Sequence, residues 1–257
     1  MIKGVDLSTF QKDVDYQALK RDGVEFAILR IGYGKDASQK DAMFEEHYKG
    51  CKDAGIKIGI YHYSYCTSNE NAEKEAINCL NYLEGRQIDL PIFYDVEDKK
   101  ILDSGVDPTT ISKIFCNKIK EAGYKSGVYA SLSWFRNYFE VYDLINDDIK
   151  IWVAQWGVSE PTAEFPYDYW QFTNSLEVGN ICCDGDYTEE FELYPEENNN
   201  NVNPDDIVID VNVCKCLAVD CIYGKYGNGD ERKQNLGNYY EETQNIINDM
   251  YEIIKGE

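Results

Sequence analysis

Along residues 1 to about 190, short runs of apolar and β-branched residues alternate with longer stretches whose apolar positions recur at helical spacing. Runs of about four to eight such residues predict strands, and apolar residues three and four positions apart predict helices. The expected strands are Lys3–Leu7, Phe26–Ile31, Lys57–Tyr63, Pro91–Glu97, Ser126–Ala130, Lys150–Ala154, Tyr169–Phe172 and Asn180–Cys183. Helices are expected near residues 15–22, 38–54, 70–84, 108–122 and 131–138.

The ends of several of these helices carry sequence signals. Asp107 and Pro108 suit an N-cap and a first helical residue, and Gly55 and Gly123 suit helix ends. Strand followed by helix, repeated along the chain, implies parallel strands joined by right-handed crossovers. The sequence therefore predicts an α/β fold, an irregular (β/α)8 barrel of the TIM type in which some helices are shortened or missing. An open, doubly wound sheet is the competing topology.

A change in charge pattern marks a boundary near residue 190. Residues 188–206 hold seven acidic residues and no lysine or arginine, and residues 196–201 read Glu-Glu-Asn-Asn-Asn-Asn. Such a polar stretch buries too little apolar surface to order itself. We therefore expect a large domain at residues 1–192, an acidic, Asn-rich linker at 193–206 and a small domain at 207–257.

The small domain contains three stretches with helical character. Residues 206–223 and 240–254 each place apolar residues on one side of a helix, and a glycine-rich turn at 224–229 precedes a shorter segment at 230–236. These stretches predict a three-helix bundle of about 50 residues, which is near the lower size limit for independent stability.

The overall charge excludes some classes of partner. The chain has 25 Lys and Arg against 47 Asp and Glu, a formal net charge of −22. Clusters of basic residues bind phosphates, so we expect neither nucleic acid nor an anionic membrane as a partner. The longest apolar run is far short of the roughly 20 residues that span a bilayer. The first six residues lack the apolar segment of a classical signal peptide, so we expect synthesis in the cytoplasm.

The cysteines and histidines form no recognisable metal site. Nine scattered cysteines suit buried thiols of a protein made in a reducing compartment, and Cys182 and Cys183 are expected to pack within a strand. A structural zinc site needs about four ligands. The chain has two histidines, His47 on a helix expected to be exposed and His62 on a strand. We therefore expect no metal and no cofactor.

Two acids end the apolar strand Pro91–Glu97. Side chains alternate faces along a strand, so Asp95 and Glu97 share one face and lie about 7 Å apart. The active sites of parallel barrels lie at this end of the strands. Two carboxyl groups in a cavity of low dielectric constant resist simultaneous ionisation, which raises the pKa of one of them. A raised pKa is what a general acid needs near neutral pH.

Further acids are expected at the same end of the barrel. Asp6 stands near the end of the first strand, and Asp184 or Asp186 follows the last strand. Because the first and eighth strands of a barrel are neighbours, these carboxyl groups converge on Asp95 and Glu97. The convergence favours a catalytic function over a solvated acidic surface.

Aromatic residues near the strand ends indicate a carbohydrate ligand. Sugar rings present apolar C–H faces that stack on aromatic rings, and their hydroxyl groups suit neighbouring amides. The candidates are Tyr61, Tyr63, Tyr129, Trp152, Trp156 and Trp170, with the amides of Gln155 and Gln171. Some of these aromatic rings are equally suited to fill the barrel core.

Seven segments, in order, resemble the glycoside hydrolase family 25 lysozymes, the N-acetylmuramidases that include many phage endolysins. The segments are Gly4–Ser8, Phe26–Gly34, Gly59–Tyr63, Pro91–Glu97, Gly127–Tyr129, Trp152–Ala154 and Trp170–Thr173. The resemblance implies an irregular barrel that cleaves the β-1,4 bond from N-acetylmuramic acid to N-acetylglucosamine in bacterial peptidoglycan, without a metal.

The same resemblance implies a role for each acid. Glu97 corresponds to the general acid, and Asp95 to a partner that polarises the 2-acetamido group of the substrate or stabilises positive charge. Asp6 and an aspartate of the last strand orient or activate groups at the floor of the groove. The family usually ends with Asp-x-Asn, whereas this chain reads Asp184-Gly185-Asp186. Asp184 is favoured as the last acid of the site, and Asp186 stays open as the alternative. The choice between direct attack by water and internal attack by the acetamido group also stays open.

The tail resembles a cell-wall-binding repeat of the CW_7 type, found on some phage lysozymes. The resemblance covers roughly 45 residues. Residues 217–233 carry its most distinctive part, and Gln244 and Asn248 continue its third helix. The resemblance implies that the small domain binds peptidoglycan. Arg232 is the expected contact, because a guanidinium suits the carboxylates and amides of a muropeptide. The alternative is that Arg232 pairs with an acid of its own bundle.

Other functions stay open on the sequence alone. A chitinase-like glycosidase also uses spaced carboxylates, but it needs an acid where this chain has Phe93. A zinc-dependent amidase or peptidase needs more histidines than the chain contains. A non-catalytic protein that only binds peptidoglycan is a third alternative. The oligomeric state stays open, and release by a phage holin or by host lysis is the expected route to the cell wall.

Overall fold

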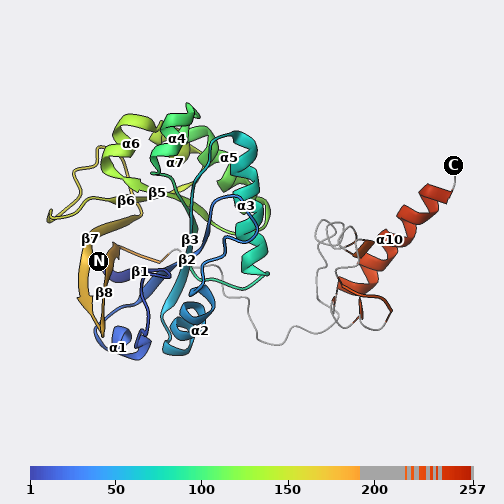
Figure 1. The fold of residues 1–257 in the computed structure, drawn as a ribbon, viewed down its shortest axis with the longest axis horizontal. Helices are drawn as coiled ribbons and strands as arrows, with labels where there is room; N and C mark the ends of the chain where they lie inside the picture. The colour runs from blue at the N-terminus through green and yellow to red at the C-terminus, as the bar shows by residue number, and fades with distance from the viewer. Residues whose placement is uncertain are drawn as a thin grey trace. The chain divides into compact units, whose positions relative to one another are not determined.

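Eight strands of the described chain close into a barrel in sequence order. A computed structural model describes residues 1–191, 218, 221–222, 226–229, 232–233, 236 and 239–255 (Figure 1). The strands are β1 (Ile2–Leu7), β2 (Phe26–Tyr33), β3 (Lys57–Tyr63), β4 (Ile92–Asp95), β5 (Ser126–Ser131), β6 (Lys150–Ala154), β7 (Tyr169–Val178) and β8 (Ile181–Thr188). The closed barrel confirms the predicted α/β fold and excludes the open sheet.

Helices run along the outside of the strands (Figure 1). They are α1 (Tyr16–Arg21), α2 (Phe44–Ala54), α3 (Asn69–Leu83), α4 (Lys99–Ser104), α5 (Pro108–Glu121), α6 (Leu132–Tyr138) and α7 (Val141–Asn146). The sequence did not predict α4 or α7, because six residues are too few to display a helical period. No helix separates β6 from β7 or β7 from β8 in this described stretch, so the barrel is irregular, as expected.

Local capping interactions determine where several helices begin and end. The Asp107 side chain accepts a hydrogen bond from the Thr110 N–H (2.9 Å), and Pro108 follows it as the first helical residue. Gly55 ends α2 in the left-handed conformation, with φ of 67°. The start of α2 differs from the prediction, because Asp41 accepts hydrogen bonds from the N–H groups of Thr9 and Met43 and holds the preceding segment as a loop.

The last strand runs opposite to the direction that we predicted. β8 pairs antiparallel with both β7 and β1, whereas β1 to β7 are parallel neighbours. The reason is a two-residue connection, Gly179-Asn180, between the paired residues Val178 and Ile181. Such a short turn can join only antiparallel strands, and Gly179 supplies the positive φ (58°) that hairpin turns require.

The hairpin also corrects the predicted strand limits. β7 and β8 extend well beyond the expected Tyr169–Phe172 and Asn180–Cys183. Asp184 and Asp186 therefore lie within β8 and not after it. Because β8 is antiparallel, its first half lies beside the end of β1, and Asp184 is the register partner of Asp6.

The barrel interior is filled by large aromatic side chains that face glycines. A core cluster inside the strands contains Phe26, Ile28, Tyr61, Leu90, Phe93, Tyr129, Trp152, Ala154 and Tyr169. A Cβ atom on Gly4 would lie 2.3 Å from the Phe26 ring, and one on Gly127 would lie 2.4 Å from the Phe93 ring. These glycines therefore allow the aromatic rings to fit inside the barrel.

A second, larger core layer lies between the strands and the helices, and it corrects one prediction. His47 is fully buried on α2 and not exposed, with its ring nitrogens 2.9 Å from the Tyr16 hydroxyl and from the Ser8 carbonyl oxygen. Helix α2 packs this face against the barrel, a contact that the polar sequence of the helix did not reveal.

Most of the cysteines fit the prediction of buried thiols. Cys51, Cys66, Cys79, Cys116 and Cys183 are buried. Cys182 is exposed, because adjacent residues of β8 face opposite sides of the sheet. Cys214 and Cys216 lie outside the described residues.

The chain divides into a first unit, Met1–Pro195, and a second unit, Glu196–Glu257. Helix α10 (Tyr240–Lys255) of the second unit confirms the third predicted helix of the tail. Buried residues of this unit, Ala218, Cys221, Leu236 and Ile247, form one small core. The predicted linker at 193–206 and most of the predicted helix at 206–223 lie outside the described residues. Among the described helices, none has the length and apolar character to cross a membrane.

We predict that Gly127→Ala destabilises the first unit by about 1 to 3 kcal/mol, because the added methyl group overlaps Phe93 in a filled interior. Urea unfolding followed by circular dichroism measures the effect. Phe93→Leu makes room for the methyl group, so the double variant should lose less stability than the sum of the two single variants. Wild-type stability of Gly127→Ala would contradict this packing argument.

Candidate active site

Five carboxyl groups gather at one end of the barrel, the end at which β1 to β7 finish and which we call the mouth. They belong to Asp6 near the end of β1, Asp95 at the end of β4, Glu97 two residues beyond β4, Asp184 in the first half of β8 and Asp186 two residues further along β8. The alternation of side chains along the strands turns Asp6, Asp95, Asp184 and Asp186 toward the barrel interior. Glu97 lies beyond the strand and is held there by the Ser131 N–H. The predicted convergence of acids from three strands is therefore present.

Asp95 and Glu97 form the pair at the end of β4. Asp95 is 6% exposed, and its Oδ1 atom has no hydrogen-bond donor among the described residues. Burial raises the pKa of Asp95 well above its usual value, and the charges of Glu97 and Asp6 raise it further. Burial also raises the pKa of Glu97, and so does the charge of Asp184, although the Ser131 N–H donates to Glu97 Oε2 (3.2 Å) and opposes this. The pair therefore retains a proton at a pH where exposed acids have lost theirs.

Gln171 on β7 connects the carboxyl groups at the floor of the mouth. Its side-chain N–H groups donate to Asp6 Oδ2 (2.8 Å) and Asp184 Oδ2 (3.4 Å). Its Oε1 atom accepts from the Tyr129 hydroxyl and from the Trp156 indole N–H, both at 3.0 Å. We noted Gln171 in the sequence as an amide for sugar hydroxyls, but its amide is occupied by these protein contacts.

Arg30 on β2 supplies positive charge to this acidic mouth. Its guanidinium donates to Asp41 Oδ2 (2.7 Å) and lies 5.1 Å from the Phe10 ring centroid and 5.7 Å from that of Tyr33. The Arg30 charge lowers the pKa of both Asp6 and Asp95, although burial outweighs it. Arg30 was not predicted to belong to the site. The feature of the sequence that could have indicated it is a single basic residue within the apolar run Phe26–Ile31.

Three of the predicted aromatic residues line or support the mouth. Tyr129 is buried and bonded to Gln171, and Tyr61 is buried with its ring 6.2 Å from that of Trp152. Tyr63 is half-buried, and its hydroxyl donates to Asp98 (3.3 Å). Tyr61 and Tyr129 thus also fill the barrel, whereas Tyr63 remains accessible at its end.

Trp156 combines exposure with a fixed position. Its side chain is on a loop after β6 and is 49% exposed, yet its indole N–H is bonded to Gln171. An exposed indole held in this way beside the carboxyl groups provides a surface on which a sugar ring can stack.

Gln155 and Trp170 lie away from the carboxyl groups. Trp170 is on the outer side of β7, where its ring contacts Phe172 and Tyr187, and its N–H donates to the Gln155 carbonyl (2.8 Å). The Gln155 side-chain amide is bonded to Thr162, through Nε2 to Oγ1 (3.1 Å) and through Oε1 to the N–H (2.7 Å). Both residues therefore hold the loop that carries Trp156.

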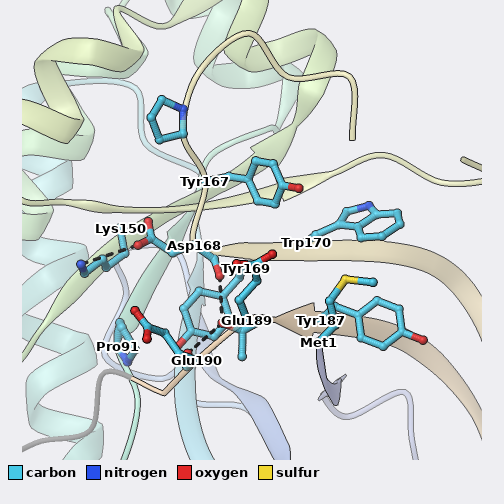
Figure 2. Close-up of a pocket in the computed structure, with 12 residues that line it drawn as sticks. Met1, Pro91, Lys150, Tyr167, Asp168, Tyr169, Trp170, Tyr187, Glu189 and Glu190 are labelled. Atoms are coloured by element: carbon cyan, nitrogen blue, oxygen red, sulfur yellow. Dashed lines mark hydrogen bonds and ion pairs between the residues drawn. The ribbon is translucent and has the colours of Figure 1, made fainter. Parts of the chain in front are cut away.

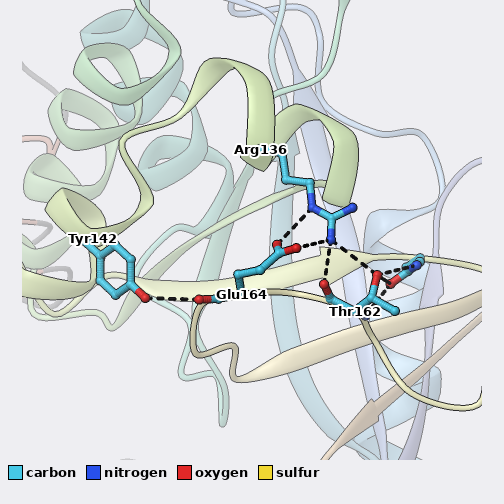
Figure 3. Close-up of polar contacts among 5 residues, drawn as sticks. Arg136, Tyr142, Thr162 and Glu164 are labelled. Carbon is cyan, nitrogen blue, oxygen red and sulfur yellow. Dashed lines mark hydrogen bonds and ion pairs between the residues drawn. The ribbon is translucent and has the colours of Figure 1, made fainter.

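This loop is also tied to the helices beside it. The Arg136 guanidinium donates two hydrogen bonds to the Glu164 carboxylate and one to the Thr162 carbonyl, as Figure 3 shows. The Tyr142 hydroxyl donates to the Glu164 carbonyl (3.1 Å). These contacts connect residues 155–164 to α6 and α7 and fix the position of Trp156 relative to the mouth.

A buried network supports β4 from behind. The Tyr94 hydroxyl donates to Glu75 Oε2 on α3 (2.7 Å) and accepts from the Ser64 hydroxyl (2.8 Å). Burial raises the pKa of Glu75 to about 7. Because Tyr94 precedes Asp95, this network holds the strand that presents the reactive pair, and its residues face the helices.

A pocket of about 600 Å³ lies at the opposite end of the barrel, where β6 begins and β8 ends (Figure 2). It is lined by Met1, Pro91, Lys150, Pro166, Tyr167, Asp168, Tyr169, Trp170, Tyr187, Thr188, Glu189 and Glu190. It contains none of the five carboxyl groups of the mouth. Lys150 forms an ion pair with Asp168 there. The pocket is therefore separate from the carboxyl groups of the mouth.

The possible metal ligands of the described residues are placed as follows. No group of three or more His, Cys, Asp and Glu side chains in this part of the chain has the arrangement of a metal site. His47 and His62 both bond backbone carbonyl oxygens in the core. The arrangement suits proton transfer by carboxyl groups and electrostatic stabilisation of a positive charge.

The sequence matches known proteins over both units. Residues 5–181 match the Glycosyl hydrolases family 25, and residues 216–250 match the CW_7 repeat. The autolytic lysozyme of Clostridium acetobutylicum is 30% identical over 193 residues, which are 73% of this chain and 55% of the relative. Lysozyme M1 of Streptomyces globisporus is 27% identical over 199 residues, 72% of this chain and 66% of the relative. The chain thus spans about half to two thirds of the length of these relatives.

Solved structures show the same barrel. The CTP1L endolysin superposes with a TM-score of 0.64 at 25% identity, covering 73% of this chain and 66% of the other. A bacterial lysozyme from Streptomyces coelicolor also gives 0.64, at 23% identity, covering 74% of this chain and 93% of the other. The family match covers more than half of the chain and confirms the resemblance seen in the sequence motifs, as the CW_7 match does for the tail. The chain belongs to the glycosyl hydrolases of family 25.

Proposed function

We propose that this chain is a lysozyme that hydrolyses the β-1,4 bond between N-acetylmuramic acid and N-acetylglucosamine in bacterial peptidoglycan. The observation that carries the proposal is the pair of buried Asp95 and half-buried Glu97 at the mouth of a family 25 barrel. The lysozyme names of the relatives support the substrate class. No cofactor has a part in this reaction.

Glu97 is the general acid in this mechanism. It is less buried than Asp95, so its oxygen is accessible to a glycan that enters the mouth. Glu97 donates its proton to the glycosidic oxygen while the bond to the anomeric carbon breaks. Water supplies the hydroxyl group of the new reducing end and returns a proton to Glu97.

Asp95 stabilises the positive charge that develops on the sugar, either directly or through the 2-acetamido group. Asp184 is the last acid of the site, because its charge acts on Glu97, and Asp6 orients the floor through Gln171. The sugar-binding residues are Tyr61, Tyr63, Tyr129 and Trp156, with Gln155 and Trp170 holding the Trp156 loop.

The CW_7 repeat attaches the enzyme to its insoluble substrate. Arg232 is the proposed contact residue. Its guanidinium bonds oxygen atoms of Cys221, Gly227, Asn228 and Gln244, which holds it in one orientation. The place of action is the bacterial cell wall, and an enzyme made in the cytoplasm reaches it through a holin or host lysis. Similarity to a lysozyme of Streptococcus phage Cp-7 and to the CTP1L endolysin supports this route.

We expect Glu97→Gln to lower kcat on purified peptidoglycan by about 100-fold to 10,000-fold, because an amide cannot donate the required proton. Borohydride reduction and mass analysis identify the new ends. Wild type should produce reducing muramic acid ends, and Glu121→Gln, an exposed change on α5, should match wild type. New reducing glucosamine ends would identify a different bond, and equal activity of Glu97→Gln would remove Glu97 from the mechanism.

The pH profile should depend on Asp184. The rate falls on the alkaline side as Glu97 loses its proton, and the negative charge of Asp184 raises the pKa of Glu97. Asp184→Asn removes that charge, so the alkaline limb of kcat/KM should move to lower pH. Asp103→Asn, an exposed change of the same charge, should leave the limb in place. If the alkaline limb of kcat/KM in Asp184→Asn moves to higher pH, the proposed effect of the Asp184 charge on Glu97 is contradicted.

Removal of the second unit should separate catalysis from wall binding. A chain ending at Pro195 keeps the whole barrel. It should hydrolyse soluble peptidoglycan fragments at the wild-type rate. It should act on intact cell walls at least about tenfold more slowly, because the tethered repeat raises the local concentration of the barrel at its substrate. Equal rates on intact walls for both chains would show that the second unit is dispensable.

A further inference from the structure

Asp186 occupies an unusual position beneath the reactive pair. It is fully buried, and its Oδ1 atom accepts the Trp152 indole N–H (2.9 Å). Its Oδ2 atom has no hydrogen-bond donor among the described residues, although that atom is also buried. An ionised carboxylate with one unsatisfied oxygen in such a site is costly.

The group that Asp186 faces is another carboxyl group. The side chains of Asp6 and Asp186 are within hydrogen-bonding reach of one another across the neighbouring strands β1 and β8. Two ionised carboxylates have only acceptor atoms, so this contact is a hydrogen bond only if one of them carries a proton. The bare Oδ2 of Asp186 is then explained, because it is the atom that holds the proton.

The surroundings place the proton on Asp186. Asp6 already accepts the Gln171 N–H (2.8 Å), and the Arg30 charge acts on it, so its ionised form has partners. Asp186 accepts the single indole N–H, whereas burial and the neighbouring carboxyl groups of Asp6 and Asp184 oppose its ionisation. We propose that Asp186 is a positioning residue that stays protonated at neutral pH and donates its proton to Asp6, which holds Asp6 as a fixed anion below Asp95.

Other titratable and charged groups around the pair act in a consistent direction. They come from β2 (Arg30), β3 (Tyr61), β4 (Asp95), β5 (Tyr129) and β8 (Cys183 and Asp184). Apart from Arg30, which acts on Asp6, these groups are neutral or negative. Burial raises the pKa of both aspartates, and Asp184 raises both further. A second ionisation of the pair is therefore opposed from several strands.

The proton makes stability depend on pH with a definite sign. The folded pair binds a proton that ordinary aspartates of the unfolded chain release above about pH 4. Folded protein thus holds more protons than unfolded protein between that pH and the raised pKa, so stability falls as pH rises through this window. The proton itself does not depend on the proposed function, but its effect on catalysis rests on that function.

The first test measures urea unfolding of the full chain from about pH 5 to about pH 8. We expect the unfolding equilibrium constant of wild type to rise up to about tenfold more per pH unit than that of Asp186→Asn, because the amide cannot release a proton. Asp103→Asn removes an equal charge at an exposed site of α4 and should keep the wild-type slope. Equal slopes in wild type and Asp186→Asn would overturn the proposal.

Asp6→Asn tests the pair from its other side and remains informative if Asp186→Asn fails to fold. The Asp6→Asn substitution removes the repulsion between the two carboxyl groups. The free energy of unfolding of this variant should therefore fall over a narrower pH range than the free energy of unfolding of wild type. A wild-type range in Asp6→Asn would contradict a shared proton. This measurement needs no enzymatic activity, so failure of the proposed function would not affect it.

Infrared spectroscopy of protein with 13C-labelled aspartate carboxyl groups locates the proton directly. Wild type at neutral pH should show a protonated aspartate band that Asp186→Asn loses and Asp103→Asn retains. In the peptidoglycan assay, Asp186→Asn should keep at least about tenfold more of kcat than Asp186→Ala, because its amide N–H can replace the donor to Asp6. If Asp186→Asn keeps the protonated aspartate band, or if Asp186→Asn and Asp186→Ala have equal kcat, the positioning role is refuted.

Discussion

The low-dielectric confinement of five carboxyl groups is the physical constraint on which the rest of this structure depends. Desolvation disfavours their ionised forms, and their mutual repulsion adds to it, so these groups keep their protons to higher pH than exposed acids do. Arg30 offsets part of this repulsion but is itself held by Asp41. The mouth can therefore hold a protonated carboxyl group beside an ionised one, and acid-catalysed cleavage of a glycosidic bond requires both forms.

The rest of the barrel keeps these groups in place against their repulsion. Aromatic rings fill the interior below the mouth, and the glycines opposite them allow close packing. Behind β4, the Glu75 and Tyr94 network anchors the strand that carries Asp95, and Gln171 connects the carboxyl groups of β1 and β8. The energetic cost of the acidic cluster is thus met by a large apolar core and by hydrogen bonds made outside the reacting groups.

The hairpin between β7 and β8 has a direct chemical consequence. In a regular parallel barrel the last strand would approach the mouth only with its final residues. The antiparallel β8 instead places Asp184 and Asp186 beside β1 with their backbone fixed by pairing on both edges. Asp184 then acts on Glu97, while Asp186 lies deeper and contacts Asp6. Two acids that are two residues apart thus act on different carboxyl groups of the mouth.

Local sequence patterns determined the positions of the strands and of most helices, because the spacing of apolar residues is a local property. The expected strand Pro91–Glu97 ends at Asp95, however, so Glu97 lies beyond it and is held beside Asp95 by the Ser131 N–H of β5. Asp107 and Gly55 likewise marked helix ends through contacts with their own neighbours. The burial of His47, the contribution of Arg30 and the central place of Gln171 depended on residues distant in the chain. Alternation also could not distinguish Trp152, inside the barrel, from Trp170, outside it, since the pattern has two faces and only closure of the barrel selects the inner one. The short turn at Gly179-Asn180 makes β8 antiparallel to β7, but which residues of β1 lie beside Asp184 and Asp186 was decided by closure of the barrel, since β1 and β8 are far apart in the chain.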